Sequence, residues 1–165
     1  MHDFGTIVIA TDGSESVERA VDVALDLAVR FDASIHALYV VDEEEVASSP
    51  ERLREEMQHA LQESGGEAIV EVQRRANELG ADRSVTAVVR EGRPADEIVA
   101  YARESDADIV ALGTRGRHGE NRFLIGSVAE RVVRSCPVPV LTVRHLPDGE
   151  GVADADAGAG SGAEP

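Results

Sequence analysis

The sequence contains no lysine and no tryptophan, and its only cysteine is Cys136. A single cysteine excludes a disulfide within the chain and is typical of a reducing compartment. Aromatic residues make up only 3% of the chain, so the core must consist mainly of the Val, Ile, Leu and Ala that dominate an apolar fraction of 42%. Hydrophobic runs are no longer than a strand, so we expect no membrane span. The first run begins almost at once, which predicts a cytoplasmic protein without a signal peptide.

Positive charge is also scarce. All 16 basic residues are arginines, against 32 acidic residues, and the formal net charge is −16. Such a surface repels nucleic acid and anionic lipid, so we expect neither as a partner. Two explanations of the charge remain open: a solvated surface suited to a cytosol of very high salt, or a surface that binds a basic partner. The acids are spread through every segment, which favours the first explanation.

Strand-like and helical segments alternate along the chain. The predicted strands are residues 6–10, 33–41, 84–90, 109–112 and 138–143. Between them lie four stretches with apolar residues at helical spacing, beginning near Ser14, Pro50, Pro94 and Ser127. This alternation predicts an α/β fold with a parallel sheet covered on both faces.

Three segments carry separate expectations. The acidic residues 42–49 are expected to form an irregular surface loop. Gly65-Gly66 should kink the long second helical region or divide it into two helices. Residues 147–165 are acidic and rich in Gly and Ala, so we expect a disordered tail after a single domain over residues 1–146.

A glycine-rich loop follows the fourth predicted strand. Gly113 ends the strand, Gly116 follows, and the loop closes on Gly126-Ser127, where a helix is expected to begin. The first N–H groups of a helix have no partner inside it, and glycine allows a phosphate to approach the backbone. The spacing G-x2-G-x9-G-S therefore predicts a phosphate-binding crossover. It is neither a P-loop, which needs Gly-Lys, nor a dinucleotide fingerprint, which belongs in the first strand-to-helix turn.

The same loop has a local excess of positive charge. Residues 113–127 hold Arg115, Arg117 and Arg122 against Glu120 alone, which favours an anion as ligand. The sequence does not say which arginine points inward. His118 could contact phosphate or act as a weak acid or base, but an exposed loop histidine is the simpler interpretation. The other histidines show no metal-ligand spacing, so no protein metal site is predicted.

With these motifs the sequence resembles the universal stress protein family, in the branch that binds ATP. The resemblance spans about residues 4–144 and includes IVIATDGSE, YVVD, EGRPADEIV, the glycine loop and CPVPVLTVR. It implies a single Rossmann-like three-layer domain whose five-stranded parallel sheet has the order 3-2-1-4-5. It also implies ATP as ligand, with Mg²⁺ or Mn²⁺, and a homodimer.

In that strand order, the turn at Asp12 and the loop at Gly113 meet at the point where the chain reverses its winding direction, a usual place for ligands. Asp12 could accept hydrogen bonds from ribose hydroxyls or metal-bound water, or could only stabilise its turn. The resemblance puts Val40 or Val41, with Val41 preferred, against adenine through its backbone, although both could simply pack in the core. The expected nucleotide contacts are Thr11, Asp12, Val41, Gly113, Thr114, Arg115, Gly116, Arg117, Gly126, Ser127 and Val128.

Two of these residues need comment. The Ser127 hydroxyl could bind a phosphate or merely belong to the helix start. Val128 is a departure, because some ATP-binding relatives carry a second hydroxyl there. Cys136 is expected to be a small buried apolar residue rather than a reactive thiol.

The sequence shows no nucleophile–base pair and no paired carboxylates near the loop, so no catalytic residue is predicted. We expect an ATP-binding homodimeric regulator of stress responses. Alternatives are a nucleotide-free scaffold dimer of the same fold and a slow ATP hydrolase. The last strand, from Val138 to Val143, lies at a sheet edge and is the expected dimer contact. Pro139 lacks a donor, so pairing should centre beyond it, near Leu141 to Val143.

Overall fold

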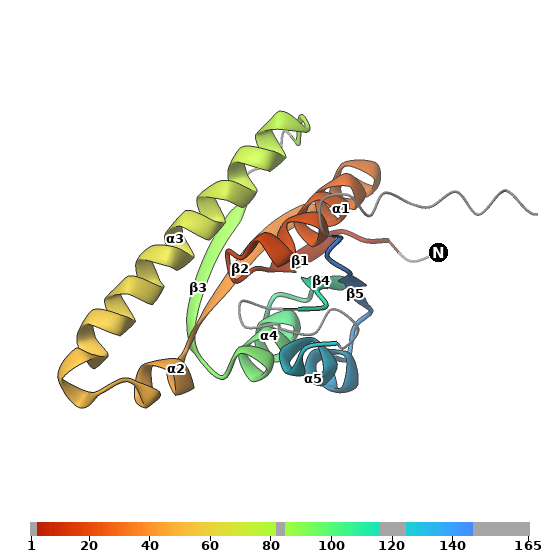
Figure 1. Cartoon of the computed structure of the whole chain (residues 1–165). Coiled ribbons are helices and arrows are strands. Elements are labelled where there is room, and N and C mark those ends of the chain that lie inside the picture. The colour runs from red at the N-terminus through yellow and green to blue at the C-terminus, as the bar shows by residue number, and fades with distance from the viewer. Residues whose placement is uncertain (1–2, 82–84, 116–124, 147–165) are drawn as a thin grey trace, which may run out of the picture.

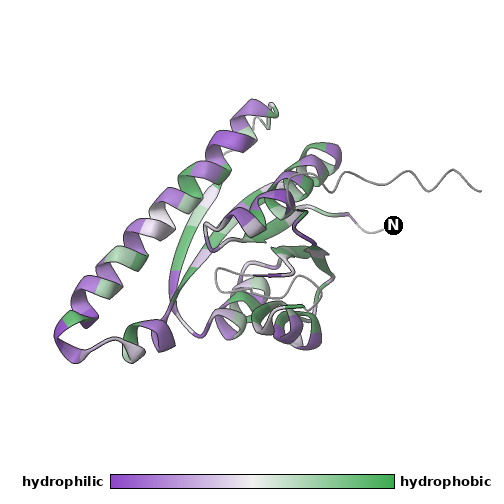
Figure 2. Ribbon diagram, viewed as in Figure 1, coloured by the Kyte–Doolittle hydropathy of each residue, from purple (hydrophilic) through white to green (hydrophobic). Residues whose placement is uncertain are grey.

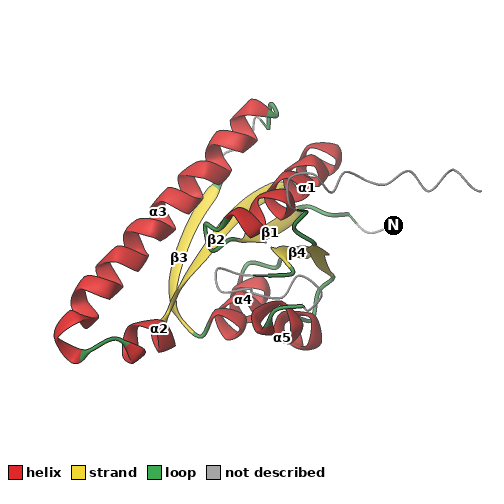
Figure 3. Cartoon of the chain, viewed as in Figure 1, coloured by secondary structure: helices red, strands yellow, loops and turns green. Residues whose placement is uncertain are grey.

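The structure is a computed structural model that describes residues 3–81, 85–115 and 125–146. Its centre is one parallel sheet with the order β3-β2-β1-β4-β5 (Figures 1 and 3). The strands are β1 (Thr6–Ala10), β2 (Ser34–Asp42), β3 (Thr86–Gly92), β4 (Ile109–Gly113) and β5 (Val140–Val143). The predicted fold class and strand order are therefore confirmed.

Helices cover both faces of this sheet (Figure 1). They are α1 (Glu15–Phe31), α2 (Glu43–Ser48), α3 (Arg54–Glu78), α4 (Pro94–Glu104) and α5 (Ser127–Ser135), with a 3₁₀ turn, η1 (Glu51–Leu53), before α3. One buried cluster lies between the sheet and α1 and α3, and a second lies between the sheet and α4 and α5. Among the described residues, no helix is long and apolar enough to cross a membrane.

The central strand β1 shows why two separate clusters form. Ile7 and Ile9 belong to the cluster under α1 and α3, whereas Val8 and Ala10 belong to the cluster under α4 and α5. Side chains alternate between the faces of a strand, so a strand with helices on both sides must be apolar throughout. Figure 2 shows this distribution, with hydrophobic strands inside and mixed helices outside.

Helix α1 buries the six residues that its apolar spacing predicts: Val17, Ala20, Val21, Ala24, Leu25 and Ala28. The helix ends at Asp32, which takes a left-handed conformation with φ of 54°. This position more often holds glycine, because a side chain is disfavoured there. Helix α1 therefore reaches β2 through a short, tight turn.

The acidic segment after β2 is a helix, not the expected irregular loop. Asp42 occupies the N-cap of α2, and its Oδ1 accepts a hydrogen bond from the Glu44 N–H at 2.9 Å. Three glutamates then fill the first turn, where negative charge is favoured by the helix dipole. The run of acids that suggested a solvated loop is thus also a good helix start.

The expected interruption at Gly65-Gly66 is wrong, because α3 is one continuous helix of 25 residues. Gly65 lies against the ring of Tyr39: a Cβ at this position would be 2.6 Å from Tyr39 Cδ1. The glycine serves close packing between α3 and β2 rather than a break. Gly66 faces open space, and a Cβ added there would meet no atom within 4 Å.

The last strand is shorter than predicted, since β5 begins at Val140 and not at Val138. Pro139 explains the difference. Its carbonyl accepts a hydrogen bond from the Val110 N–H at 3.0 Å, so its backbone faces β4. Proline has no N–H to donate back, and the ladder starts at the next residue. Strands β2 and β3 end at Asp42 and Gly92, beyond the predicted ends at residues 41 and 90, toward the edge where α2 and α4 begin.

Replacing Gly65 and Gly66 singly by alanine should change the stability of the protein in opposite directions, because the two glycines have different surroundings. Gly66→Ala is expected to stabilise the protein by about 1 kcal/mol, because alanine is the better helix former. Gly65→Ala has the same gain in propensity but forces the buried Tyr39 ring to move, and such overpacking costs about 1–3 kcal/mol. Urea unfolding of both variants measures the difference. Equal stability of the two would show that Tyr39 does not constrain α3.

Candidate functional site

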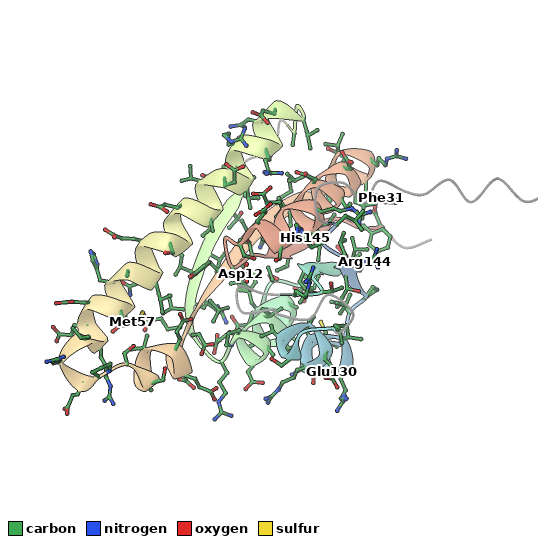
Figure 4. The ribbon with its side chains drawn as sticks, viewed as in Figure 1. Asp12, Phe31, Met57, Glu130, Arg144 and His145 are labelled. Atoms are coloured by element: carbon green, nitrogen blue, oxygen red, sulfur yellow. The ribbon has the colours of Figure 1, made fainter. Side chains whose placement is uncertain are left out.

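A cavity of about 340 Å³ opens at the carboxyl ends of the strands. Its walls come from the ends of β1, β2 and β4 and the starts of α4 and α5. Eight of the predicted contact residues line it: Thr11, Asp12, Gly113, Thr114, Arg115, Gly126, Ser127 and Val128. In Figure 4, Asp12 lies near the middle of the molecule, with Met57 of α3 on one side and Glu130 of α5 on the other. Gly116 and Arg117 lie outside the described residues, as does His118.

The turn between β1 and α1 is held by its own side chains. Asp12 Oδ1 accepts hydrogen bonds from the Ser14 N–H at 2.9 Å and from Ser14 Oγ at 2.6 Å. Thr11 Oγ1 accepts from the Gly13 N–H at 3.1 Å, and Gly13 has a φ of 75° that suits glycine. Asp12 therefore stabilises this turn, and the same residue lines the cavity, so its two suggested roles are compatible.

On the other side of the cavity, backbone hydrogen bonds bring the loop ends together. The Thr114 N–H donates to the Val143 carbonyl at 3.1 Å, and the Gly126 N–H donates to the Thr114 carbonyl at 2.6 Å. As a result, α5 begins directly beside the end of β4. A Cβ on Gly113 would lie 3.3 Å from the Ser16 carbonyl oxygen, so the start of α1 also packs closely against the end of β4.

The start of α5 faces the cavity with polar backbone groups. The first hydrogen bond of the helix runs from the Glu130 N–H to the Gly126 carbonyl at 2.9 Å. The N–H groups of Ser127, Val128 and Ala129 precede that bond and have no acceptor within the helix. All three residues line the cavity. They form the donor group that the glycine spacing predicts for an anion.

Arg115 is the arginine that the structure places at the cavity. Its Nε atom is buried and has no hydrogen-bond partner among the described residues. A buried donor without a partner is costly, and a native structure normally supplies one. An anion in the cavity would be such a partner. Arg117 and Arg122 lie outside the described residues, so their orientation stays open.

The opposite wall of the cavity is acidic. Asp42 and Glu45 line it from the end of β2 and from α2, and Asp12 lies at the end of the neighbouring β1. Among the described lining residues, Arg115 is the only basic one. The cavity is thus polarised, with donors at the β4–α5 end and carboxylates at the β2–α2 end. Sequence reasoning missed Asp42 and Glu45, because it treated residues 42–49 as an irregular loop.

Val40 and Val41, the two residues considered for contact with adenine, lie on opposite faces of β2. Val40 lines the cavity, together with Leu38 on the same face of the strand. The Val41 side chain points to the opposite face and is buried in the cluster under α1 and α3. Core packing of Val41 is therefore observed, and a contact from its backbone to adenine stays a prediction. Pro94 and Ile98 of α4 add to the apolar wall beside Val40.

A second cavity of about 340 Å³ lies between α1 and α3 and shares Thr11, Asp12 and Val17 with the first. Arg75 lies at this cavity and forms ion pairs with Glu18, Asp22 and Glu71. Hydrogen bonds from Arg74 and Arg75 lower the pKa of Glu71 to about 2. The pairs of Arg75 with Glu18 and Asp22 join α3 to α1. In the described parts of the chain, no group of three or more His, Cys, Asp or Glu side chains is arranged to hold a metal ion.

Cys136 follows α5 as its C-cap. It is a free, half-buried thiol that packs against the cluster under α4 and α5. Its apolar packing agrees with the prediction, but the residue is half-buried and not buried as expected.

Known proteins share both the sequence and this architecture. The model of the universal stress protein family matches residues 3–144. Universal stress protein MJ0531 of Methanocaldococcus jannaschii is 41% identical over 139 residues, which cover 84% of this chain and 81% of that protein. A universal stress protein of Methanothermobacter thermautotrophicus is 34% identical over 141 residues, covering 85% of this chain and 95% of the relative.

Solved structures agree. Hypothetical protein MJ0577, whose structure was used to assign its biochemical function, has a TM-score of 0.76 at 26% identity, covering 87% of this chain and 98% of its own. A universal stress protein in complex with cAMP has a TM-score of 0.65 at 27% identity, and the match covers 86% of this chain and 98% of that protein. The family match over almost the whole described domain, together with the shared fold, shows that this chain belongs to the universal stress protein family.

Proposed function

We propose that this protein binds ATP, with Mg²⁺ or Mn²⁺, in the cavity at the carboxyl ends of the strands, and acts in the cytosol as a homodimeric nucleotide-dependent regulator of stress responses. The observation that carries the proposal is the convergence of Gly113, the start of α5 at Ser127 and the buried Arg115 Nε on one end of this cavity. Every one of these groups can donate to, or make room for, a phosphate.

The other end of the cavity suits a nucleoside. Leu38, Val40 and Ile98 provide an apolar wall against which a flat base can pack. Asp12 lies between the two ends, where ribose hydroxyls could donate to its carboxylate. The structural relative in complex with cAMP supports an adenine nucleotide as the ligand class.

A divalent cation suits the electrostatics. ATP brings several negative charges into a cavity whose described lining residues include Asp12, Asp42 and Glu45 against a single arginine. A cation carried by the phosphates would lower this repulsion, and Mg²⁺ is commonly bound through phosphates and few carboxylates. The described residues hold no ready metal cluster, so the cation would enter with the nucleotide.

The groups in the cavity favour binding of ATP over its efficient hydrolysis. Two polar side chains that line the cavity already take part in the turn before α1: Asp12 Oδ1 accepts from the Ser14 N–H, and Thr11 Oγ1 accepts from the Gly13 N–H. Slow background hydrolysis is compatible with the proposal. A turnover assay with and without Mg²⁺ distinguishes it from regulation by binding alone.

Calorimetric titration of ATP with Mg²⁺ tests the proposal most directly. Molar KCl is the appropriate medium, because salt screens the repulsion expected from a net charge of −16. We expect binding by the parent and its loss in a Gly126→Val, Ser127→Ala variant, since a valine side chain would lie where the phosphate approaches α5. Circular dichroism of the variant checks that it is folded. A folded parent that binds no adenine nucleotide would favour the nucleotide-free scaffold.

Arg115 offers a test of the phosphate end alone. Arg115→Met should weaken ATP binding about tenfold to hundredfold, as expected for loss of a charge-assisted hydrogen bond. Arg134→Met is the matched control, because Arg134 is an exposed arginine of α5 that pairs with Glu130 and does not line the cavity. Equal weakening by both variants would indicate a general charge effect and would remove Arg115 from the site.

The dimer is proposed through β5, the edge strand next to β4. The carbonyls of Pro139 and Val143 accept hydrogen bonds from Val110 and Thr114, so these residues face β4. Because backbone groups alternate in direction along a strand, Val140 and Thr142 present theirs to the open edge. The missing N–H of Pro139 therefore does not weaken this edge, contrary to the sequence-based expectation. A second β5 could pair antiparallel, with the two-fold axis at Leu141.

Thr142→Pro should separate the dimer without unfolding the monomer. Proline removes the outward N–H of residue 142 and leaves the ladder to β4 intact, as proline does when it is tolerated on edge strands. Thr142→Ala keeps the N–H and is the control. Sedimentation velocity should show a dimer for the parent and for the alanine variant, and a monomer for the proline variant. A dimeric proline variant would place the interface elsewhere.

A further inference from the structure

We infer that Glu45 of α2 selects the base of the bound nucleotide, by accepting a hydrogen bond from the exocyclic amino group of a 6-aminopurine. This inference rests on the proposed function and goes beyond it, because it names the residue that would read the base. It begins from the polarity of the cavity. Phosphate-binding groups gather at the β4–α5 end, so the base of a nucleotide must lie toward the β2–α2 end, where Glu45 is part of the wall.

The three glutamates of α2 face different surroundings. Glu43 and Glu44 lie toward Arg93, with distances of 3.7 and 3.5 Å from their Oε1 atoms to Arg93 Nε. Glu45 instead is half-buried and lines the cavity. Of the three consecutive glutamates, only Glu45 lines the cavity, although nothing in the sequence distinguishes it from the other two.

Local hydrogen bonds hold α2, and with it the backbone of Glu45, in place. Asp42 caps the helix start. At the other end, Ser48 Oγ and Ser49 Oγ donate to the Glu45 carbonyl at 2.9 and 3.3 Å. Arg54 of α3 donates to the carbonyls of Ala47 and Ser49 at 3.2 and 3.3 Å. A reader of base identity needs such support, because selectivity depends on a fixed acceptor position.

The chemistry of the wall then indicates which base edge fits. An ionised carboxylate only accepts hydrogen bonds, so it favours a donor on the base and repels a carbonyl oxygen. The amino group at position 6 of adenine is such a donor. Asp42 lines the same wall, and its Oδ1 caps the start of α2 by accepting from the Glu44 N–H. Glu45 can interact with the ligand without loss of this cap.

The test compares ATP with purine riboside 5′-triphosphate, which differs only in lacking the 6-amino group. Calorimetry in molar KCl with Mg²⁺ should show the parent binding ATP about tenfold to hundredfold more tightly than the analogue, as expected for a hydrogen bond to a charged group. In Glu45→Met this ratio should fall to near one. Glu44→Met removes the same charge from the outer side of α2 and should keep the parental ratio.

The ratio separates base reading from general charge effects. Removing either glutamate changes repulsion toward both nucleotides equally, because both carry the same triphosphate. A Glu45→Met variant that binds both nucleotides with the parental ratio would overturn the role of Glu45 and leave ATP binding standing. A change confined to Mg²⁺ dependence would likewise overturn it, and would place Glu45 near the cation. A folded parent that binds neither nucleotide would overturn both proposals.

Discussion

The close contact between the end of β4 and the start of α1 is the constraint on which the site depends. A Cβ at position 113 would lie 3.3 Å from the Ser16 carbonyl oxygen, which is a tight contact, and 3.5 Å from the Val17 Cα, which is an ordinary one. This contact joins two segments about a hundred residues apart, the turn at Asp12 and the loop that leads to α5. Strand order makes it possible, because β1 and β4 are neighbours from which the chain winds outward in opposite directions. A larger residue at position 113 would move the β4–α5 end of the cavity away from the Asp12 turn.

Much of the fold follows from patterns that the sequence states locally. The apolar face of α1, the proline at the start of α4 and the order of strands and helices all depend on residues close together in the chain. The error at Gly65 arose because a local rule was overridden by a tertiary contact. Gly65 indicates a break by its own preference, yet it fits α3 to the Tyr39 ring on another element. Only the packing of α3 on β2 reveals which rule prevails.

The β4–α5 end of the candidate site could be predicted from the sequence better than the β2–α2 end. The phosphate end rests on glycine spacing and on the start of a helix, which are sequential features. The β2–α2 end depends on which face of a strand and which turn of a short helix point to the cavity. Val40 rather than Val41 lines the wall because side chains alternate along β2, and a shift of one residue in the predicted strand exchanges the two. Glu45 could have been suggested by the Asp-Glu-Glu-Glu run, had it been read as a capped helix start.

The cavity is polarised although the protein as a whole is strongly acidic. In a chain with 32 acidic residues, carboxylates near the proposed site would repel an anionic ligand unless they lie away from its charged groups. The structure separates them: Arg115 and the α5 N–H groups lie at one end, and Asp42 and Glu45 lie at the other. A ligand that is anionic at both ends would be repelled by the β2–α2 wall, and a cationic ligand would leave the buried Arg115 Nε without a partner. The nucleotide proposed as ligand would satisfy both ends in one orientation, because its phosphates are acceptors and its sugar and base carry donors. In that orientation the carboxylates of the β2–α2 wall would face the sugar and base and would lie away from the phosphates.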